Sequence, residues 1–548
     1  MALSELPKAF DLPSNFKKGY FPYKFNTIKN ANYVGLLPAI EYYGANSMKP
    51  KERDIFLQWH ENHKNDVFNM QRDIIEYCIY DVVILREACL KFRPVISSKG
   101  NTFSYYKCKN AEKINYIDVS SLYPNVCKYG KFPIGHPKIH IGNTKCYSLN
   151  LQNINGLIKC KILPPERLYH PVLPLKQNNK LMFTLCRLCS EQRNQNKFCT
   201  HSNDERALTG TWVIDEVIKA LEKNYRILET YEIWEYDVSQ YNKLKNAEGL
   251  FSKMMDKFLK IKQEASGWPS KCCTKDQKEK YIEDFLQNED IQLEYEKVLN
   301  NPGLRSFAKL MLNSFWGKFG QRENLQKTNI INEPFELYEM LTNAAIEVCH
   351  ILPINERNIV INWQYKEEVT ESLSTVNVSI AAFTTAQARL KLYTYLEKLD
   401  NRVLYYDTDS IFYISREGEY EPHTGEFIGD MTNELESYGQ GSYVTEFVSG
   451  GPKNYAYKVF STKDNSEKVV CKVKGIRLNY DASHKINFET IKEAVLNLNN
   501  FENISIFSDN IRRTKEHELN TVSETKTYQP KSEKRRFLSD YSSLPFGY

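Results

Sequence analysis

Residues 403–414, VLYYDTDSIFYI, form an apolar and aromatic run that is interrupted by Asp407 and Asp409. Short runs of β-branched and aromatic residues are typical of buried strands, and Asp-Thr-Asp-Ser is typical of a turn. The segment therefore predicts a hairpin. An isolated D-x-D is most often a solvated turn, whereas two carboxylates at the tip of buried strands need a cation to offset their repulsion. The second interpretation requires a third carboxylate elsewhere.

Asp118 supplies a candidate for that third carboxylate. It lies in NYIDVSSLYP, residues 115–124, where an apolar strand runs into a turn. One interpretation is a cap for a following helix. Together with Asp407 and Asp409, however, it gives three carboxylates at strand ends. Such a set is suited to two Mg²⁺ ions about 3.5–4 Å apart, as in-line phosphoryl displacement requires.

Residues 301–321 predict a helix with one chemically distinctive face. The segment opens with Asn-Pro, a typical cap and first-turn pair. Arg305, Lys309, Asn313 and Trp316 recur every three or four residues and therefore share a face. A solvated helix edge is the alternative. A face that combines cations, an amide and an aromatic ring is better suited to a triphosphate and a stacked base.

The remaining pattern is less distinctive. Residues 68–92 and 378–400 have apolar residues at helical spacing and predict two further helices. Residues 211–263 also predict helical structure, and residues 1 to about 65 predict largely irregular structure. The tail from about residue 485 predicts a helix followed by a polar and basic segment.

Bulk composition is that of a soluble protein with several domains. The chain has 548 residues, of which 41% are hydrophobic and 26% charged, and its net charge of +5 permits a nucleic-acid partner without requiring one. We find no signal sequence and no apolar run near 18 residues, which predicts an intracellular protein without a membrane partner. The nuclear, cytoplasmic and mitochondrial alternatives stay open. The 13 scattered cysteines predict free thiols rather than a disulfide framework.

Four potential metal ligands lie close together in the sequence. Cys186 and Cys189 form a C-x2-C knuckle, and Cys199 with His201 forms a C-x-H pair ten residues later. Four sulfur and nitrogen ligands at such spacing predict a closed tetrahedral Zn²⁺ site. Reduced thiols in a polar loop are the alternative.

Taken together, these motifs resemble those of family B DNA polymerases of the protein-primed branch, such as those of Maverick/Polinton elements and related viruses and plasmids. The motif D-x2-S-L-Y-P matches Asp118, Ser121, Leu122, Tyr123 and Pro124. The motif K-x3-N-S-x-Y-G matches Lys309, Asn313, Ser314 and Gly317, with Trp316 in place of Tyr. The remaining matches are Y-x-D-T-D-S at Tyr405, Asp407, Thr408, Asp409 and Ser410, T-x2-A-R at Thr385, Ala388 and Arg389, and K-x-Y at Lys453 and Tyr455.

The resemblance implies a role for each matched residue. Asp118, Asp407 and Asp409 would be catalytic and would bind two Mg²⁺ ions. The implied substrate-binding residues are Ser121, Leu122, Tyr123, Arg305, Lys309, Asn313 and Trp316. Tyr123 would lie under the incoming sugar and exclude a 2′-hydroxyl. Thr385, Arg389, Lys453 and Tyr455 would contact DNA.

The resemblance also implies an α+β multidomain fold of the right-hand polymerase type, with an antiparallel-sheet palm, helical fingers and a small thumb. The expected domains are a partial exonuclease-like region (1–100), palm (101–150 and 376–480), an insertion with the zinc knuckle (151–240), fingers (241–325), a second insertion (326–375) and a thumb or C-terminal region (481–548). The implied partners are a DNA template-primer, deoxynucleoside triphosphates and a terminal priming protein.

An exonuclease remnant is the last expectation. Tyr77 and Asp81 match the family's Y-x3-D motif, but no acid in residues 1–76 lies in a D-x-E within an apolar strand. A lone ligand does not hold an ion pair, so we expect a truncated or otherwise proofreading-deficient polymerase. Two rivals remain, a catalytically decayed or domesticated DNA-binding protein of a mobile element and a two-metal nuclease. The intact carboxylates argue against the first, and Lys309 with Tyr123 argues against the second.

Overall fold

A large antiparallel sheet lies at the centre of the computed structural model, which describes residues 19–48, 50–74, 77, 99–178, 180–195, 198–269, 271–321, 324–369, 375–497, 501–513, 519–530 and 534–548. Within these residues the sheet has nine strands in the order β20-β19-β18-β5-β16-β15-β3, with β17 paired to β5 and β4 to β18. Their bounds are β3 Lys99–Asn101, β4 Tyr105–Lys107, β5 Lys113–Val119, β15 Val403–Asp407, β16 Ser410–Ser415, β17 Met431–Asn433, β18 Tyr443–Gly451, β19 Asn454–Ser461 and β20 Ser466–Lys472.

The predicted hairpin is confirmed as β15 and β16, and its side chains are buried on both faces. Because successive side chains of a strand point to opposite faces, Ile411 and Tyr413 enter one core cluster and Phe412 enters another. Phe412 stacks on Tyr116 of β5, with ring centroids 3.9 Å apart and planes at 7°. The continuous apolar run is therefore explained by burial on both sides of the sheet.

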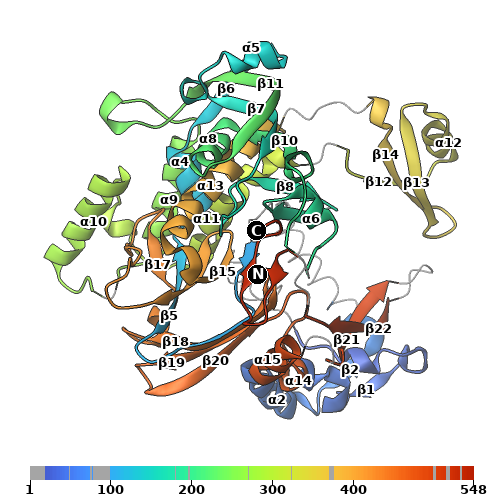
Figure 1. Ribbon diagram of the computed structural model, residues 1–548. Helices are drawn as coiled ribbons and strands as arrows, with labels where there is room; N and C mark the ends of the chain where they lie inside the picture. Colours follow the sequence, from blue (N-terminus) through green and yellow to red (C-terminus); the bar gives the residue numbers. More distant parts are fainter. Residues whose placement is uncertain are drawn as a thin grey trace.

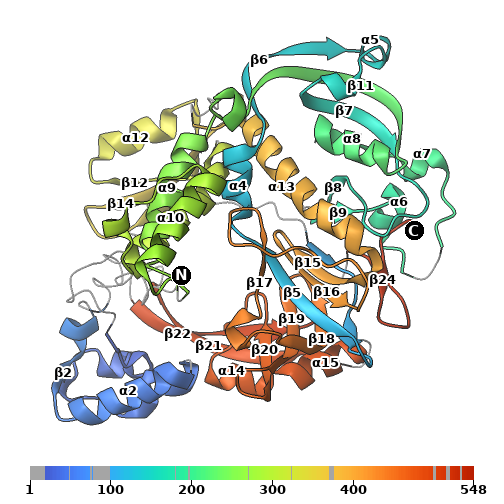
Figure 2. The ribbon, with the colours of Figure 1, turned by 90° about the vertical axis from the view of Figure 1, so that its left-hand side faces the viewer.

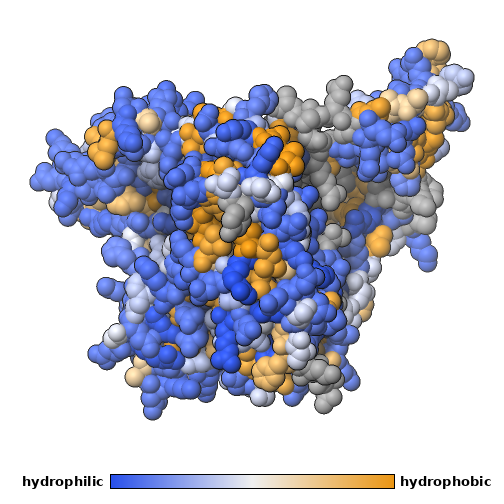
Figure 3. Space-filling view, turned by 45° about the horizontal axis from the view of Figure 1, so that its top comes forward, coloured by the Kyte–Doolittle hydropathy of each residue, from blue (hydrophilic) through white to orange (hydrophobic). Residues whose placement is uncertain are grey.

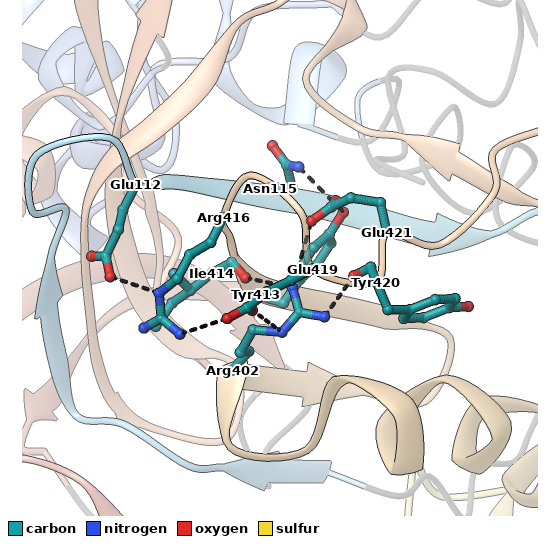
Figure 4. A network of polar contacts seen from close by, with 9 residues as sticks. All are labelled: Glu112, Asn115, Arg402, Tyr413, Ile414, Arg416, Glu419, Tyr420 and Glu421. Atoms are coloured by element: carbon teal, nitrogen blue, oxygen red, sulfur yellow. Dashed lines mark hydrogen bonds and ion pairs between the residues drawn. The ribbon is translucent and has the colours of Figure 1, made fainter.

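An ion-pair network fixes the end of the hairpin opposite the Asp407 turn (Figure 4). The guanidinium of Arg402 donates to the carbonyl of Ile414 at 3.2 Å and lies 2.9 Å from a carboxylate oxygen of Glu419. The Arg416 side chain donates to Glu112 at 2.9 Å, which ties β16 to the loop before β5. These contacts hold the two strands in register from their base.

Helices cover the sheet and continue into a separate helical layer (Figures 1 and 2). The confirmed helix α13 (Val378–Leu399) packs with α4 (Leu122–Tyr129) against β5 and β16. Next to α4 lie α9 (Ser252–Glu264), α10 (Lys275–Glu289) and α11 (Pro302–Ser314), which share a core. The predicted start of α11 is confirmed, since Asn301 Oδ1 accepts the Leu304 N–H.

The helical prediction for residues 211–263 is wrong over most of its length. A four-stranded sheet in the order β10-β7-β11-β6 occupies this part of the fold, and α8 (Ile214–Glu222) packs on it. Its strands are β6 Phe132–Ile141, β7 Gly156–Leu163, β10 Leu208–Val213 and β11 Arg226–Ser239. β11 is rich in β-branched and aromatic residues with acids every two or three positions, and pairing with both β6 and β7 outweighs any local helical preference. Shorter elements nearby are α5 Asn143–Tyr147, β8 Pro174–Gln177, β9 Lys180–Phe183, α6 Arg187–Glu191 and α7 Asn203–Arg206.

Both ends of the chain contain more regular structure than predicted. The described part of the N-terminal region, from residue 19 on, is not largely irregular, because α2 (Pro50–His63) buries Phe56 among aromatic rings and β1 (Val34–Leu36) pairs with β2 (Val67–Asn69). Of the helix predicted for residues 68–92, residues 68 and 69 belong to β2, residues 70–74 and 77 are helical, and the others lie outside the described residues. The helix predicted at the start of the tail is confirmed as α15 (Phe488–Leu496), which follows α14 (Tyr480–Lys485), and the described part of the polar segment after it forms strand pairs that were not predicted. These are β21 Ile504–Arg513 with β22 Leu519–Tyr528, and β23 Arg536–Phe537 with β24 Ser543–Leu544.

A small module projects from the side of the molecule (Figure 1). It consists of β12 (Lys327–Ile331), α12 (Pro334–Thr342), β13 (Ile346–Pro353) and β14 (Ile359–Tyr365). Figure 3 shows a mostly hydrophilic face on which hydrophobic side chains gather near the middle and on this module. None of the described helices combines the length and the apolar character needed to cross a membrane.

Candidate active site

Strand pairing brings the three predicted carboxylates to one end of the central sheet. Ser410 of β16 lies opposite Asp118 of β5 on one side and opposite Asp407 of β15 on the other. Residues directly opposite one another across a sheet share a face, so Asp118 and Asp407 point the same way. Asp409 lies in the turn that joins the two hairpin strands. Segments almost 290 residues apart in the chain thus contribute to one acidic site.

The turn itself is tightly constrained. The Asp409 N–H donates to the Asp407 carbonyl at 2.5 Å, and the Asp409 carbonyl accepts the Val119 N–H at 2.7 Å. Thr408 has a φ of 52°, a left-handed conformation that a β-branched residue rarely adopts. Its hydroxyl donates to Asp407 Oδ1 at 3.0 Å. Such local strain is typical of sites where side-chain placement is fixed by function.

Burial and like charge raise the pKa values of two of the carboxyls. Burial raises the pKa of Asp118 to about 8, with the negative charges of Asp409 and Glu434 as further causes. Burial also raises the pKa of Asp409 to about 6, and the Asp407 charge adds to this effect. An oxygen-donor set whose members repel one another in a partly buried site fits hard divalent cations such as Mg²⁺.

A cluster of cations faces these acids from α9 and α11. Lys309 lies near enough to Asp118 for its charge to lower that carboxyl's pKa, which opposes the effect of burial. Lys262, which sequence reasoning missed, donates to Ser121 Oγ at 2.9 Å. Burial, together with the charges of Lys309 and Arg305, lowers the pKa of Lys262 to about 8. Three cations that crowd one another in this way suit a polyanionic ligand.

The aromatic residues of the site differ from the prediction. Arg305, Lys309 and Asn313 are exposed on α11, whereas Trp316 follows the helix and is only 5% exposed. The Trp316 ring stacks on Tyr123, with centroids 4.4 Å apart and planes at 20°. Trp316 therefore supports Tyr123 from behind and does not lie on the open helix face with the other three residues.

Tyr123 is part-buried beside the acids, and burial followed by the Asp409 charge raises its pKa. Ser121, at the start of α4, has a left-handed φ of 51°, and its hydroxyl oxygen accepts a hydrogen bond from Lys262. Leu122 is 2% exposed and its side chain lies in the core. Its predicted substrate contact therefore does not involve its side chain.

The four predicted DNA contacts are mostly engaged within the protein. The Thr385 hydroxyl, on a side chain that is 7% exposed, donates to the Ala381 carbonyl at 3.1 Å. Arg389 makes a two-pronged ion pair with the buried Glu216, at 2.8 and 3.1 Å. The Arg389 pair thus joins α13 to α8, whereas the Thr385 hydroxyl bonds to its own helix, so both polar groups are already engaged within the protein.

The K-x-Y pair lies at the turn between β18 and β19. Lys453 has a left-handed φ of 58°, and its Nζ lies 4.0 Å from Asp407 Oδ2. Tyr455 is 5% exposed and packs against Tyr405, with centroids 5.0 Å apart. Lys453 is thus placed at the acidic site, whereas Tyr455 belongs to the core beneath it.

Two charged residues near the acids were missed from the sequence. Glu434, just after β17, raises the pKa values of both Asp118 and Asp409, and Lys472 of β20 lowers that of Asp118. Neither belongs to a recognisable motif. Glu434 comes to the site because β17 pairs with β5. Lys472 comes to the site because β20 belongs to the same sheet.

The other predicted sites lie away from the acids. The ligand atoms of Cys186, Cys189, Cys199 and His201 lie within 4.8 Å of one another, as the zinc prediction requires. Tyr77 of the exonuclease motif stacks on Phe21, with centroids 5.3 Å apart. Its partner in the motif, Asp81, lies outside the described residues.

Comparisons with known proteins show the family of this chain. The model of the family described as "DNA polymerase type B, organellar and viral" matches residues 1–106, 100–288 and 271–401. A probable DNA polymerase of Neurospora intermedia is 23% identical over 544 residues, which cover 90% of this chain and 48% of that protein. The DNA polymerase of Bacillus phage PZA is 22% identical over 367 residues, which cover 63% of this chain and 49% of that protein. This chain thus spans about half the length of these two relatives.

Solved structures of phi29 DNA polymerase share the fold. The orthorhombic crystal form superposes with a TM-score of 0.51 at 15% identity, covering 97% of this chain and 78% of that chain. The complex of that polymerase with primer-template DNA gives a TM-score of 0.50 at 16% identity, covering 96% and 78%. The match confirms the predicted multidomain α+β fold. Because the family model matches well over half of the residues, this chain belongs to the organellar and viral family of type B DNA polymerases.

Proposed function

We propose that this chain is a DNA-directed DNA polymerase, which joins deoxynucleoside triphosphates to a primer hydroxyl and releases pyrophosphate. One observation carries the proposal. Carboxyls with raised pKa values at the sheet end, Asp118 and Asp409, face Lys309 of the helical layer closely enough for its charge to affect Asp118. Nucleotidyl transfer needs this pairing, since acids hold divalent ions and cations hold phosphates.

In this proposal Asp118 and Asp409 hold two Mg²⁺ ions, with Asp407 beside them. When bound, the ions would lower the pKa of the primer hydroxyl and neutralise charge on the leaving pyrophosphate. Lys309 and Arg305 bind the triphosphate from the exposed face of α11. Lys262 adds a third cation and also fixes Ser121, whose left-handed backbone begins α4 and so places Tyr123.

Tyr123 is proposed to select the sugar. Its ring is stacked on the Trp316 indole, which restricts its movement, and it lies near enough to Asp409 for that charge to raise its pKa. A rigid ring beside the nucleotide leaves no space for a 2′-hydroxyl, whereas a deoxyribose fits. The replacement of the family's tyrosine by Trp316 keeps the aromatic support, and the indole N–H finds no hydrogen-bond partner within the described residues.

The proposed partners are a DNA template-primer and a priming protein that offers a hydroxyl group. The central sheet would form the palm, α9 to α11 the fingers, and the region after residue 480 the thumb. Lys453 lies at the sheet end beside Asp407, where its positive charge suits the primer phosphates. Protein-primed replication of a viral or mobile element is proposed from the family, because a phage polymerase is among its relatives.

Primer extension tests the proposal against its rivals. Purified wild-type protein with Mg²⁺ is expected to extend a labelled DNA primer on a template. Asp409→Asn is expected to abolish extension and to keep DNA binding, whereas Asp237→Asn, an exposed aspartate on β11, keeps both. Binding without extension by the wild type would favour the decayed DNA-binding protein. Template cleavage that depends on Asp409, without extension, would favour the nuclease.

We also propose that this chain does not proofread. Tyr77 packs against Phe21, so it is held in the N-terminal core. The exonuclease motif otherwise contributes Asp81 alone, and one carboxylate does not hold the ion pair that hydrolysis needs. A 3′-mismatched, end-labelled primer incubated with Mg²⁺ and no nucleotides is expected to keep its length. Shortening that disappears in Asp81→Ala would refute this proposal and leave the polymerase proposal intact.

A further inference from the structure

The cysteine and histidine cluster has the geometry of a tetrahedral metal site. His201 Nδ1 lies 3.4 Å from the sulfur of Cys186, 3.2 Å from that of Cys189 and 3.6 Å from that of Cys199. Metal bonds of about 2.0–2.3 Å in a tetrahedron give ligand separations of roughly 3.4–3.8 Å. The three histidine–sulfur separations are thus close to that range, and all four ligand atoms lie within 4.8 Å of one another.

Local structure positions each ligand. Cys186 precedes α6, and its sulfur accepts the Cys189 N–H at 3.4 Å, which stabilises a thiolate. A reciprocal capping box between Ser202 and Glu205 begins α7 immediately after His201 and fixes the chain there. Three sulfurs and one imidazole leave no open position, so the site suits structure rather than catalysis.

The last residues of the sequence pack on the knuckle formed by Cys186 and Cys189. We define residues 535–548 as the C-terminal strap, which runs beside α6 (Figure 2). The Phe546 side chain, 1% exposed, packs on Met182, Cys186 and Cys189. The Phe546 carbonyl accepts the Leu185 N–H at 2.8 Å and the Thr184 hydroxyl at 2.9 Å.

Gly547 shows how closely the strap approaches a metal ligand. Its φ is +91°, and a Cβ built at this position would lie 2.4 Å from Cys186 Cβ and 2.6 Å from Cys186 N. No side chain fits in this space, so backbone packs directly on the ligand residue. A shift of Cys186 would therefore displace the strap.

The strap also reaches the strand that borders the acidic hairpin. The Ser543 N–H donates to the Thr102 carbonyl at 2.7 Å, directly after β3, which pairs with β15 up to Asp407. Arg535 is 4% exposed and donates to the carbonyls of Tyr169 and Ser543, at 3.2 and 3.1 Å. The strap thus connects the knuckle to the edge of the central sheet.

We propose that Cys186, Cys189, Cys199 and His201 bind one Zn²⁺, and that this ion holds the C-terminal strap in place. The apolar cluster around Phe546 contains few residues, and a cluster of that size does not order a loop and a chain end without help. Zinc binding supplies that stabilisation, because the free energy of binding ligands drawn from separate loops is folding free energy. The proposal is independent of the polymerase proposal.

Metal content and affinity test the site itself. The full chain, purified under reducing conditions from zinc-containing medium, is expected to carry about one zinc per chain. Cys199→Ser should lower the zinc affinity, measured by competition with a chromophoric chelator, by roughly 100-fold or more, since loss of supporting groups around a site already costs 10- to 100-fold. Cys349→Ser, on β13 outside the cluster, should keep wild-type zinc. A wild type without zinc, and without the visible bands of tetrahedral thiolate on Co²⁺ addition, would overturn the proposal.

Hydrogen exchange tests the link to the strap and does not depend on a variant's folding. Removal of zinc from the wild type by a chelator is expected to accelerate exchange at Leu185 and over residues 536–546, and zinc addition should reverse the change. Phe546→Ala should accelerate exchange of the strap while the protein keeps one zinc. If zinc removal leaves exchange of the strap unchanged, the ion does not hold the strap and the proposal fails.

Discussion

Replacing Asp118 by asparagine is expected to stabilise the central sheet in metal-free protein, although it removes a proposed catalytic group. The folded-state pKa of Asp118 is about 8, whereas an unfolded aspartate has a pKa near 4. Between these values the folded state binds more protons than the unfolded state. The free energy of unfolding therefore falls as pH rises from about 4 to about 8. Asparagine has no such dependence and removes the repulsion from Asp409.

The size of the effect follows from the pKa difference. A pH of 7.5 is about 3.5 units above the pKa of the unfolded carboxyl, and each unit corresponds to about 1.36 kcal/mol. The upper limit of the destabilisation by Asp118 is therefore about 5 kcal/mol. Asp118 keeps partial contact with water, which we take to halve the effect, to about 2 kcal/mol. At pH 6 the same reasoning gives about 1 kcal/mol.

Native-state hydrogen exchange in EDTA measures this quantity locally, which is needed because a chain with several domains does not unfold in two states. Amides of β5 and β16 are compared between wild type and Asp118→Asn at pH 6 and 7.5. The exposed aspartate variant Asp237→Asn serves as the control and should match the wild type at both. An opening free energy that is unchanged or lower in Asp118→Asn, or a gain that does not grow with pH, would refute the reasoning. With Mg²⁺ present the variant should not incorporate nucleotides.

Three further outcomes are expected. Tyr123→Ala should raise the ratio of ribonucleotide to deoxynucleotide kcat/KM at least about tenfold, because the ring beside the sugar is lost; an unchanged ratio would remove Tyr123 from sugar selection. Lys262→Met should raise the KM for nucleotides, while Lys260→Met, which loses pairs with Glu294 and Glu264, should not. Since the Lys262 pKa is about 8, its charge is present below that pH, so wild-type KM should rise between pH 7 and 9 and that rise should be absent in Lys262→Arg. Glu216→Gln leaves Arg389 without its partner carboxylate and should lower the stability of α13, measured by hydrogen exchange, by about 3 kcal/mol; a change below about 1 kcal/mol would contradict a structural role for the pair.

The predictions that were correct concern segments in which the local residue pattern and the tertiary surroundings favour the same structure. The hairpin at Asp407 reads as buried strands because both of its faces are covered, and α11 begins where Asn301 and Pro302 indicate. The Cys and His spacing likewise predicted a cluster that the fold brings together. In each case neighbouring residues determine the structure, so a short window of sequence is sufficient.

The errors arose where distant strands decide the structure. β11 is a strand because β6 and β7 flank it, and neither partner is visible in its own residues. β21 and β22 pair across ten positions, although the polar character of this tail gave no sign of strands. Lys262 of α9 reaches Ser121 and the other cations, and Glu434 reaches the acids from the end of β17, so no spacing in the sequence could identify them.

The attachment of the C-terminal strap to β3 has a consequence for the order of folding during synthesis. The Thr102 carbonyl lies directly after β3. Its hydrogen-bond partner Ser543 is synthesised 441 residues later. At about 5–20 residues per second the ribosome needs roughly 20–90 s to make that interval. Once β15 has paired with β3, that edge of the central sheet stays without the strap until Ser543 has been made, and an unpaired strand edge readily pairs with other chains. A nascent chain that stalls after the sheet strands have formed but before residues 535–548 have emerged therefore carries an exposed edge.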